Sequence, residues 1–137
     1  VSRGWLPVEP EAFSRVMMWL GFAGREMAPL LRLRMADIQA APVSGRSVVE
    51  AECRRALGVL EDHVYEGELC GRRWLVGEHP TVADVAAFPG VALMADCGLA
   101  LEDYPALWRW AHAFKRLPGF IVMPGVLPPR LADALAA

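Results

Sequence analysis

The sequence predicts an all-α domain, a helical bundle of about five helices. Apolar residues recur at spacings of three and four in several long windows, which is the pattern of helices that turn one face to a core. Two segments begin with Ser or Thr followed three residues later by an acid, a pattern that caps helix starts. No window alternates apolar and polar residues with a period of two, so nothing indicates a β-sheet.

The first ten residues, VSRGWLPVEP, have a glycine, two prolines and no apolar period, so we expect an irregular linker there. From residue 11 the apolar spacing predicts one long helix that extends to residue 31. Gly21 and Gly24 weaken this helix or allow another element to approach it closely. The apolar face is expected to hold Phe13, Val16, Met17, Leu20, Ala23, Met27, Leu30 and Leu31.

A second helix is predicted after the loop APVSGRS. Ser47 and Glu50 fit a capping box, in which each side chain satisfies a free amide at the helix start. The buried stripe is expected to be Val49, Cys53, Ala56, Leu57, Leu60 and Val64. The charged residues are expected on the solvated face, and they are Glu50, Glu52, Arg54, Arg55, Glu61 and Asp62.

The segment WLVGEHPTVADVAAF, residues 74–88, predicts the start of a third helix. Thr81 and Asp84 match the capping pattern, with Thr81 as the cap and the acid at the positive end of the helix dipole. Between Asp84 and Asp96 there is no charged residue. A helix that is apolar on every side belongs in the middle of a bundle, where its first amides need partners from its own side chains. A role for Asp84 as a catalytic acid is the alternative.

The remaining elements are predicted from prolines and glycines. Pro89 should kink the central helix or open one of its backbone bonds, and Gly98 should end it. Pro105 fits the first turn of a further helix that Pro118 and Gly119 stop. The apolar side of that helix is expected to be Leu107, Trp108, Ala111, Phe114 and Leu117. A short terminal helix is predicted over residues 129–136.

Composition narrows the function classes. The chain has 137 residues, which fits one compact domain, and its formal net charge of −2 has none of the basic excess that nucleic-acid binding requires. No apolar stretch is long enough to span a membrane and no signal peptide is visible, so we expect a cytoplasmic protein. Three cysteines (Cys53, Cys70, Cys97) and three histidines (His63, His79, His112) are scattered too widely to predict a disulfide framework or a metal site.

The order of these parts resembles the C-terminal helical domain of cytosolic glutathione transferases, and the sequence resembles bacterial members most. The resemblance rests on RVMMWLGFAGREMAPLL in the first helix, LVGEHPTVADVAAF with its capping Thr81 and Asp84, YPALWRWAHAFKRLPGF, and IVMPGVLP. Together these segments cover nearly the whole chain in the order of the family. Residues 1–10 then resemble an interdomain linker and residues 11–137 the helical domain.

The resemblance leaves out the thioredoxin-like domain with which family members begin. That domain holds the residue that activates the glutathione sulfur and most of the contacts to the tripeptide. We therefore expect either a piece of a longer transferase-like protein or a natural protein made of the helical half alone. In neither case does the resemblance imply a cofactor, and glutathione enters only as the co-substrate of a complete enzyme.

The resemblance also implies where substrate residues lie, since the helical domain of the family supplies the wall of the electrophile pocket. By position these residues are Trp19, Phe22, Arg25, Met27 and Met123. An apolar pocket suits hydrophobic electrophiles, and a cation such as Arg25 would stabilise the negative sulfur. The alternative is that Arg25 is a solvated surface residue and that Trp19 and Phe22 belong to the core.

Two functions follow from the resemblance. The first is the electrophile-binding half of a glutathione transferase, in which the thiolate adds to an electrophile. The second is a non-catalytic protein-interaction module of the same fold. We also expect a homodimer, because family dimers form partly through the first two helices of this domain.

Overall fold

The computed structural model describes residues 3–121, and this part of the chain contains five α-helices, three short 3-10 turns and no strand. The elements are η1 (Arg3–Trp5), α1 (Pro10–Arg25), α2 (Ala28–Ile38), α3 (Arg46–Leu69), α4 (Val82–Ala92), η2 (Met94–Cys97), η3 (Leu101–Asp103) and α5 (Pro105–Lys115). The predicted all-α fold is confirmed. The helix predicted over residues 129–136 lies outside the described residues.

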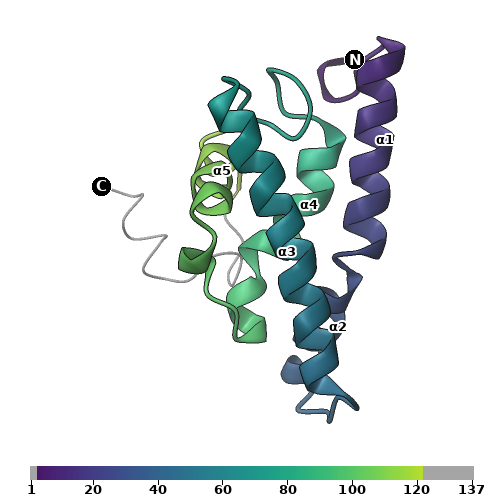
Figure 1. The fold of residues 1–137 in the computed structure, drawn as a ribbon, viewed down its shortest axis with the longest axis vertical. Coiled ribbons are helices and arrows are strands. Elements are labelled where there is room, and N and C mark those ends of the chain that lie inside the picture. The colour runs from purple at the N-terminus through teal and green to yellow at the C-terminus, as the bar shows by residue number, and fades with distance from the viewer. Residues whose placement is uncertain (1–2, 122–137) are drawn as a thin grey trace.

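The helices form a bundle in which α4 lies between α1 and α5 (Figure 1). α1 continues downward into α2, and the long helix α3 runs back along α2 in the opposite direction. α1 packs mainly against α4, whereas α3 packs against α2 and α5. The core therefore lies where α4 meets the other helices.

The single helix predicted over residues 11–31 is wrong, because the chain breaks between α1 and α2. Glu26 ends α1 with its N–H bonded to the carbonyl of Phe22 at 2.8 Å. Pro29 then stands in the first turn of α2, where its missing N–H costs nothing. The apolar spacing runs across the break because both helices pack on one core. Of the predicted face, Val16, Met27 and Leu30 are buried, whereas Phe13, Met17 and Leu31 are exposed.

The capping box predicted for Ser47 and Glu50 is also wrong. α3 begins two residues earlier than predicted, at Arg46, and its N-cap is Gly45, which adopts a left-handed conformation with φ 65° and offers no side chain. Ser47 is thus already inside the helix. Glu50 instead accepts a hydrogen bond from Arg46 Nε at 2.8 Å. A helix start at Gly45, which has no capping side chain, cannot be found by a search for Ser or Thr followed by an acid.

The buried stripe of α3 is confirmed in full, since Val49, Cys53, Ala56, Leu57, Leu60 and Val64 are all buried. The placement of Glu61 on the solvated face is wrong. Its two carboxylate oxygens accept the backbone N–H groups of Ala106 and Leu107, each at 2.8 Å. Because these are the first N–H groups of α5 after Pro105, the carboxylate on α3 caps α5.

Replacing Glu61 by alanine should lower the free energy of unfolding by about 1–2 kcal/mol, because two amides at the start of α5 lose their acceptor. Urea denaturation measures this loss. Glu66→Ala is the matched control, since it removes an exposed carboxylate from the same helix. Equal losses for the two variants would show that the cap contributes nothing beyond helix propensity.

The lack of charge in α4 predicted a helix buried on every side, and this prediction is wrong. Ala83, Asp84, Ala87, Phe88, Val91 and Ala92 are buried. Val85, Ala86 and Pro89 are exposed, and Val85 keeps 45% of its accessible surface. The helix passes through Pro89 and ends at Ala92, after which η2 leads to Gly98 with φ 72°. An uncharged sequence marks an apolar helix without showing what covers each of its faces.

In α5, Trp108 differs from the prediction. It was expected inside and is 37% exposed, whereas Trp110, which the prediction left out, is 1% exposed and packs against Phe88 of α4. Leu107, Ala111 and Phe114 are buried as predicted, and the Phe114 ring stacks on Phe88 with centroids 4.3 Å apart.

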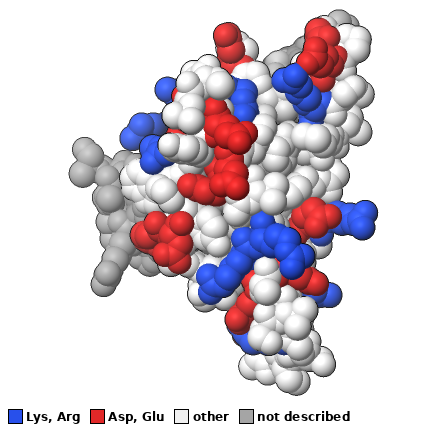
Figure 2. Space-filling view, viewed as in Figure 1, with Lys and Arg blue, Asp and Glu red and all other residues white. Residues whose placement is uncertain are grey.

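The charged side chains of the face in Figure 2 are of both signs and are interspersed, so neither sign dominates that face. Most of the ion pairs between residues 3 and 121 are on the surface, such as Arg15 with Glu11 and Arg32 with Glu52, where each contributes little to stability. Among the described residues, no helix is long and apolar enough to cross a membrane.

Candidate functional site

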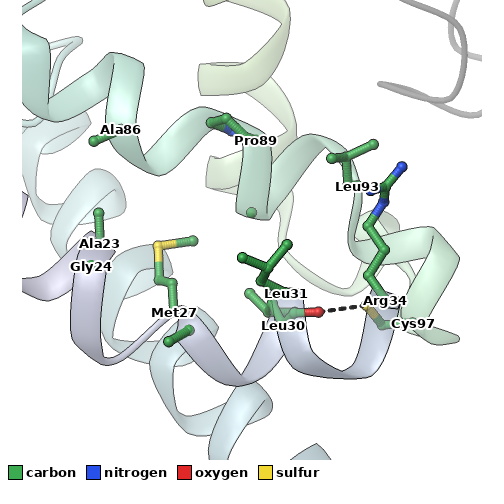
Figure 3. Close-up of a pocket in the computed structure, with 12 residues that line it drawn as sticks. Ala23, Gly24, Met27, Leu30, Leu31, Arg34, Ala86, Pro89, Leu93 and Cys97 are labelled. Atoms are coloured by element: carbon green, nitrogen blue, oxygen red, sulfur yellow. Dashed lines mark hydrogen bonds between the residues drawn. The ribbon is translucent and has the colours of Figure 1, made fainter. Parts of the chain in front are cut away.

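An apolar groove lies between the α1–α2 segment and α4 (Figure 3). We call it the α1–α4 groove, and its volume is about 250 Å³. It is lined from the first segment by Ala23, Gly24, Met27, Ala28, Leu30, Leu31 and Arg34, and from the other side by Ala86, Pro89, Gly90, Leu93 and Cys97.

The break between α1 and α2 and the small residues of α4 together make this groove. Met27 stands in the break, and its side chain points toward α4 beside Ala86 and Pro89 (Figure 3). A Cβ at Gly90 would lie 2.6 Å from Met27 Cε, so the absence of a side chain at Gly90 lets Met27 lie against the helix. The result is a hollow with apolar walls from elements about sixty residues apart in the chain.

The groove has one polar end, beside η2. Arg34 Nε donates to Asp96 Oδ2 at 3.0 Å, so this cation is already paired. Cys97 donates its thiol hydrogen to the carbonyl of Leu30 at 3.3 Å (Figure 3). Burial raises the pKa of Cys97 to about 11, so it remains a thiol at neutral pH and is a poor nucleophile. The groove therefore offers shape and apolar contact rather than a reacting group of its own.

Of the substrate residues that the resemblance implied, Met27 alone lines this groove among those the structure describes. Trp19 is 5% exposed and packs in the core, with its ring centroid 5.1 Å from Phe22 and 4.2 Å from His63. Arg25 lies at the end of α1, with 89% of its side chain exposed and Nε 3.5 Å from Glu26 Oε1. Met123 lies outside the described residues.

Sequence reasoning did not single out the residues of α4 that form the opposite wall, nor Arg34. Two signals were available for that wall. The run after Asp84 carries no charge, and it contains Gly90, whose missing side chain allows another element to approach closely. Nothing in the sequence distinguishes Arg34 from other surface arginines, because its place follows from the packing of η2 on α2.

Asp84 occupies the centre of the bundle and is 0% exposed. Its Oδ1 accepts the N–H of Leu75 at 2.9 Å and the indole N–H of Trp110 at 3.1 Å. Its Oδ2 accepts the N–H of Thr81 at 2.8 Å and the Thr81 hydroxyl at 3.0 Å. Thr81 is the N-cap of α4 and forms a capping box with this acid. The carboxylate thus faces four internal donors and does not line the α1–α4 groove.

Within residues 3–121, no group of three or more His, Cys, Asp and Glu side chains lies together in a way that could hold a metal ion. In the same part of the chain, the three cysteines are free, with Cys53 and Cys97 buried and Cys70 exposed.

Comparison with known proteins gives one consistent family. Residues 45–113 match the family model described as the C-terminal domain of glutathione S-transferase. Glutathione S-transferase verG of Clonostachys rogersoniana is 28% identical over 89 residues, which are 63% of this chain and 36% of that protein. A glutathione S-transferase structure from Xanthobacter autotrophicus Py2 is 28% identical with a TM-score of 0.77, over 89% of this chain and 60% of its own.

A glutathione transferase homolog from Lodderomyces elongisporus, solved with two GSH per subunit, shares the fold at 23% identity and a TM-score of 0.72. The match covers 85% of this chain and 56% of that one. The chain thus spans little more than half the length of these solved structures and about a third of the curated relative.

Proposed function

Because the chain belongs to the glutathione S-transferase family, as its C-terminal domain, we propose that it is the electrophile-binding half of a glutathione transferase. The α1–α4 groove is the observation that carries this proposal. Its walls are apolar, it is open to one side, and it contains Met27, one of the residues at which the family resemblance placed the substrate. No described feature favours the alternative function, a non-catalytic interaction module.

The chemistry follows from the division of work between two domains. A thioredoxin-like domain binds glutathione, the co-substrate, and the thiolate sulfur bonds to the electrophilic carbon while the leaving group departs, as chloride does from a chlorodinitrobenzene. The helical domain holds the apolar body of the electrophile in the groove and keeps water away from it. Arg25 is the cation proposed to stabilise the sulfur, and its exposed guanidinium leaves it accessible to a second domain. No cofactor is needed for this addition.

The exposed face of α4 supports the presence of such a second domain. Val85, Ala86 and Pro89 are exposed apolar residues of this helix, and Ala86 and Pro89 also line the groove, so a domain that packed on α4 here would close the groove as well. We propose that a thioredoxin-like domain covers it and completes the groove, with residues 1–10 as the connection. Cytoplasmic location fits a reaction that uses a reduced thiol.

We also propose a homodimer formed through the outer side of α1. Phe13, Met17 and Met18 are 40%, 49% and 58% exposed there, and exposed apolar side chains grouped in this way are the kind of surface that a protein partner covers. Sedimentation at micromolar concentration should give a dimer. A monomer at every concentration would contradict this part and leave the groove proposal unaffected.

The test of function joins the chain behind a thioredoxin-like domain and measures conjugation of glutathione to a chlorodinitrobenzene. Leu31→Ser should raise the KM for the electrophile about fivefold, because a lost apolar contact is worth roughly 1 kcal/mol. Val59→Ser is the matched control, since Val59 is also an exposed apolar residue (47%, against 61% for Leu31) and lies outside the groove. Arg25→Ala should lower kcat/KM with little effect on stability.

Two results would count against the proposal. Equal KM values for the Leu31 and Val59 variants would remove the groove as the substrate site. Glutathione binding by the 137-residue chain alone, measured by calorimetry, would contradict the division of work between two domains.

A further inference from the structure

A second groove lies beside α5, apart from the α1–α4 groove. We call it the α5 groove, and it has a volume of about 780 Å³. The end of α3, the loop over residues 71–74 and α5 form its walls, and it shares no residue with the α1–α4 groove. Trp74 and Trp110 lie at its base, and Trp108 with Ala113 and Leu117 gives it further apolar surface.

The α5 groove carries an excess of positive charge. Four arginines line it against a single acid, Glu68. Arg109 takes up that acid through two hydrogen bonds, of 2.9 and 2.6 Å. Arg72 turns inward to backbone carbonyls. Arg73 and Arg116 have no ion pair or side-chain hydrogen bond with any residue in the range 3–121, so two guanidinium groups line the groove unneutralised.

His112, which also lines the α5 groove, is a buried polar group. It is 5% exposed, and neither Nδ1 nor Nε2 has a hydrogen-bond partner among the residues that the structure describes. Burial, together with the nearby Lys115 and Arg116, lowers the pKa of His112, so its ring is neutral at pH 7 and has one N–H to donate. Buried polar atoms in folded proteins are normally bonded, so an unbonded pair at a groove indicates a missing partner.

Trp108 gives the groove a flat aromatic surface beside this histidine. Its ring centroid lies 3.8 Å from that of His112, and the side chain is 37% exposed. A planar aromatic ligand could therefore stack on the exposed part of Trp108 while a polar substituent reaches His112. A carboxylate accepts hydrogen bonds and is attracted by guanidinium groups. It would therefore suit both the N–H of His112 and the guanidinium groups of Arg73 and Arg116.

We propose that the α5 groove binds a small aromatic carboxylate, whose ring lies on Trp108 and whose carboxylate lies toward His112, Arg73 and Arg116. The volume of the groove is in the range of small-molecule sites. The proposal does not depend on transferase activity, because the groove is separate from the α1–α4 groove.

The test is an NMR titration of the chain with 1-naphthoate and, separately, with 1-naphthamide, which has the same shape without the charge. The His112 ring signals should shift with naphthoate, and the Kd should be about tenfold lower than for the amide, because two charge contacts each contribute up to roughly fivefold. Added salt should weaken binding of the naphthoate only. The Met27 methyl signal reports binding in the α1–α4 groove and should remain in place.

Arginine variants complete the test. Arg73→Gln and Arg116→Gln should each raise the Kd of naphthoate about threefold or more. Arg55→Gln should leave it unchanged, since Arg55 is exposed on α3 and lies outside the groove. Equal affinity for acid and amide, no effect of the two variants, or a shift of Met27 without a shift of His112 would each overturn the proposal.

Discussion

Replacing Asp84 by alanine is expected to lower the free energy of unfolding by about 3 kcal/mol or more, a large fraction of the roughly 5–15 kcal/mol that stabilises a typical domain. The carboxylate accepts from Leu75, from the backbone and hydroxyl of Thr81, and from the indole of Trp110. Its removal leaves three buried N–H groups without an acceptor, and each such group costs roughly 1–3 kcal/mol. Capping of α4 alone would cost only about 0.5–2 kcal/mol.

Thr81→Ala separates the two contributions. It removes one hydroxyl and leaves the Thr81 backbone N–H bonded to Asp84, so the loss should stay near 1 kcal/mol. Asp96→Ala serves as a control for removal of a carboxylate, because Asp96 has an exposed side chain and one ion pair. Urea denaturation gives all three values. If Asp84→Ala and Thr81→Ala cost the same, Asp84 acts as a helix cap and the bonds to Leu75 and Trp110 contribute nothing.

The helices of this domain could be predicted from sequence because burial imposes a spacing. The stripe from Val49 to Val64 follows one face of α3, and each of its members is buried as expected. The break at Met27 could not be predicted in the same way, since the spacing continues from α1 into α2 and both pack on one core. The spacing of apolar residues shows which face of a helix is buried. It does not show a change in chain direction when the residues on both sides of the break pack on the same core.

Charged and polar residues were harder, because their roles depend on partners that are distant in sequence. Glu61 looks like its solvated neighbours on α3, yet it caps a helix that begins 44 residues later, at Pro105. Trp108 and Trp110 have similar local sequence and opposite exposure. Asp84 was identified as a cap from the Thr-x-x-Asp pattern, but its bonds to Leu75 and Trp110 depend on tertiary packing alone.

Only the family resemblance, and no pattern in the sequence itself, led to a residue of the candidate site. It placed a substrate residue at Met27, which lines the α1–α4 groove. A groove is a property of two elements together, so the residues of α4 could not be assigned from one helix. The resemblance also pointed to Trp19, whose place in the core is explained by its contacts with Phe22 and His63.

Arg72→Met is the second change with a large expected effect, about 2–3 kcal/mol of unfolding free energy. The guanidinium is half-buried and donates to the carbonyls of Trp74, Leu75 and His63, so it ties the loop after α3 back onto that helix. Methionine fills similar space but donates to none of these carbonyls, so the Trp74 carbonyl loses the guanidinium and the Leu75 carbonyl keeps only its contact with His63 Nε2 at 2.9 Å. Lysine should recover only part of the loss, because one ammonium cannot follow the fork of the guanidinium.

Gly67 offers an independent test of the same contact. A Cβ at this position would lie 2.6 Å from Arg72 Nη2, so only glycine lets the guanidinium rest on α3. Gly58, in the interior of the same helix, has nothing within 4 Å of its would-be Cβ. Gly58→Ala should therefore stabilise the protein by about 0.5–1 kcal/mol through helix propensity, whereas Gly67→Ala should give no gain because it displaces Arg72. Equal stabilisation by both substitutions would mean that Arg72 moves aside without cost, and the loss expected for Arg72→Met would then have no basis.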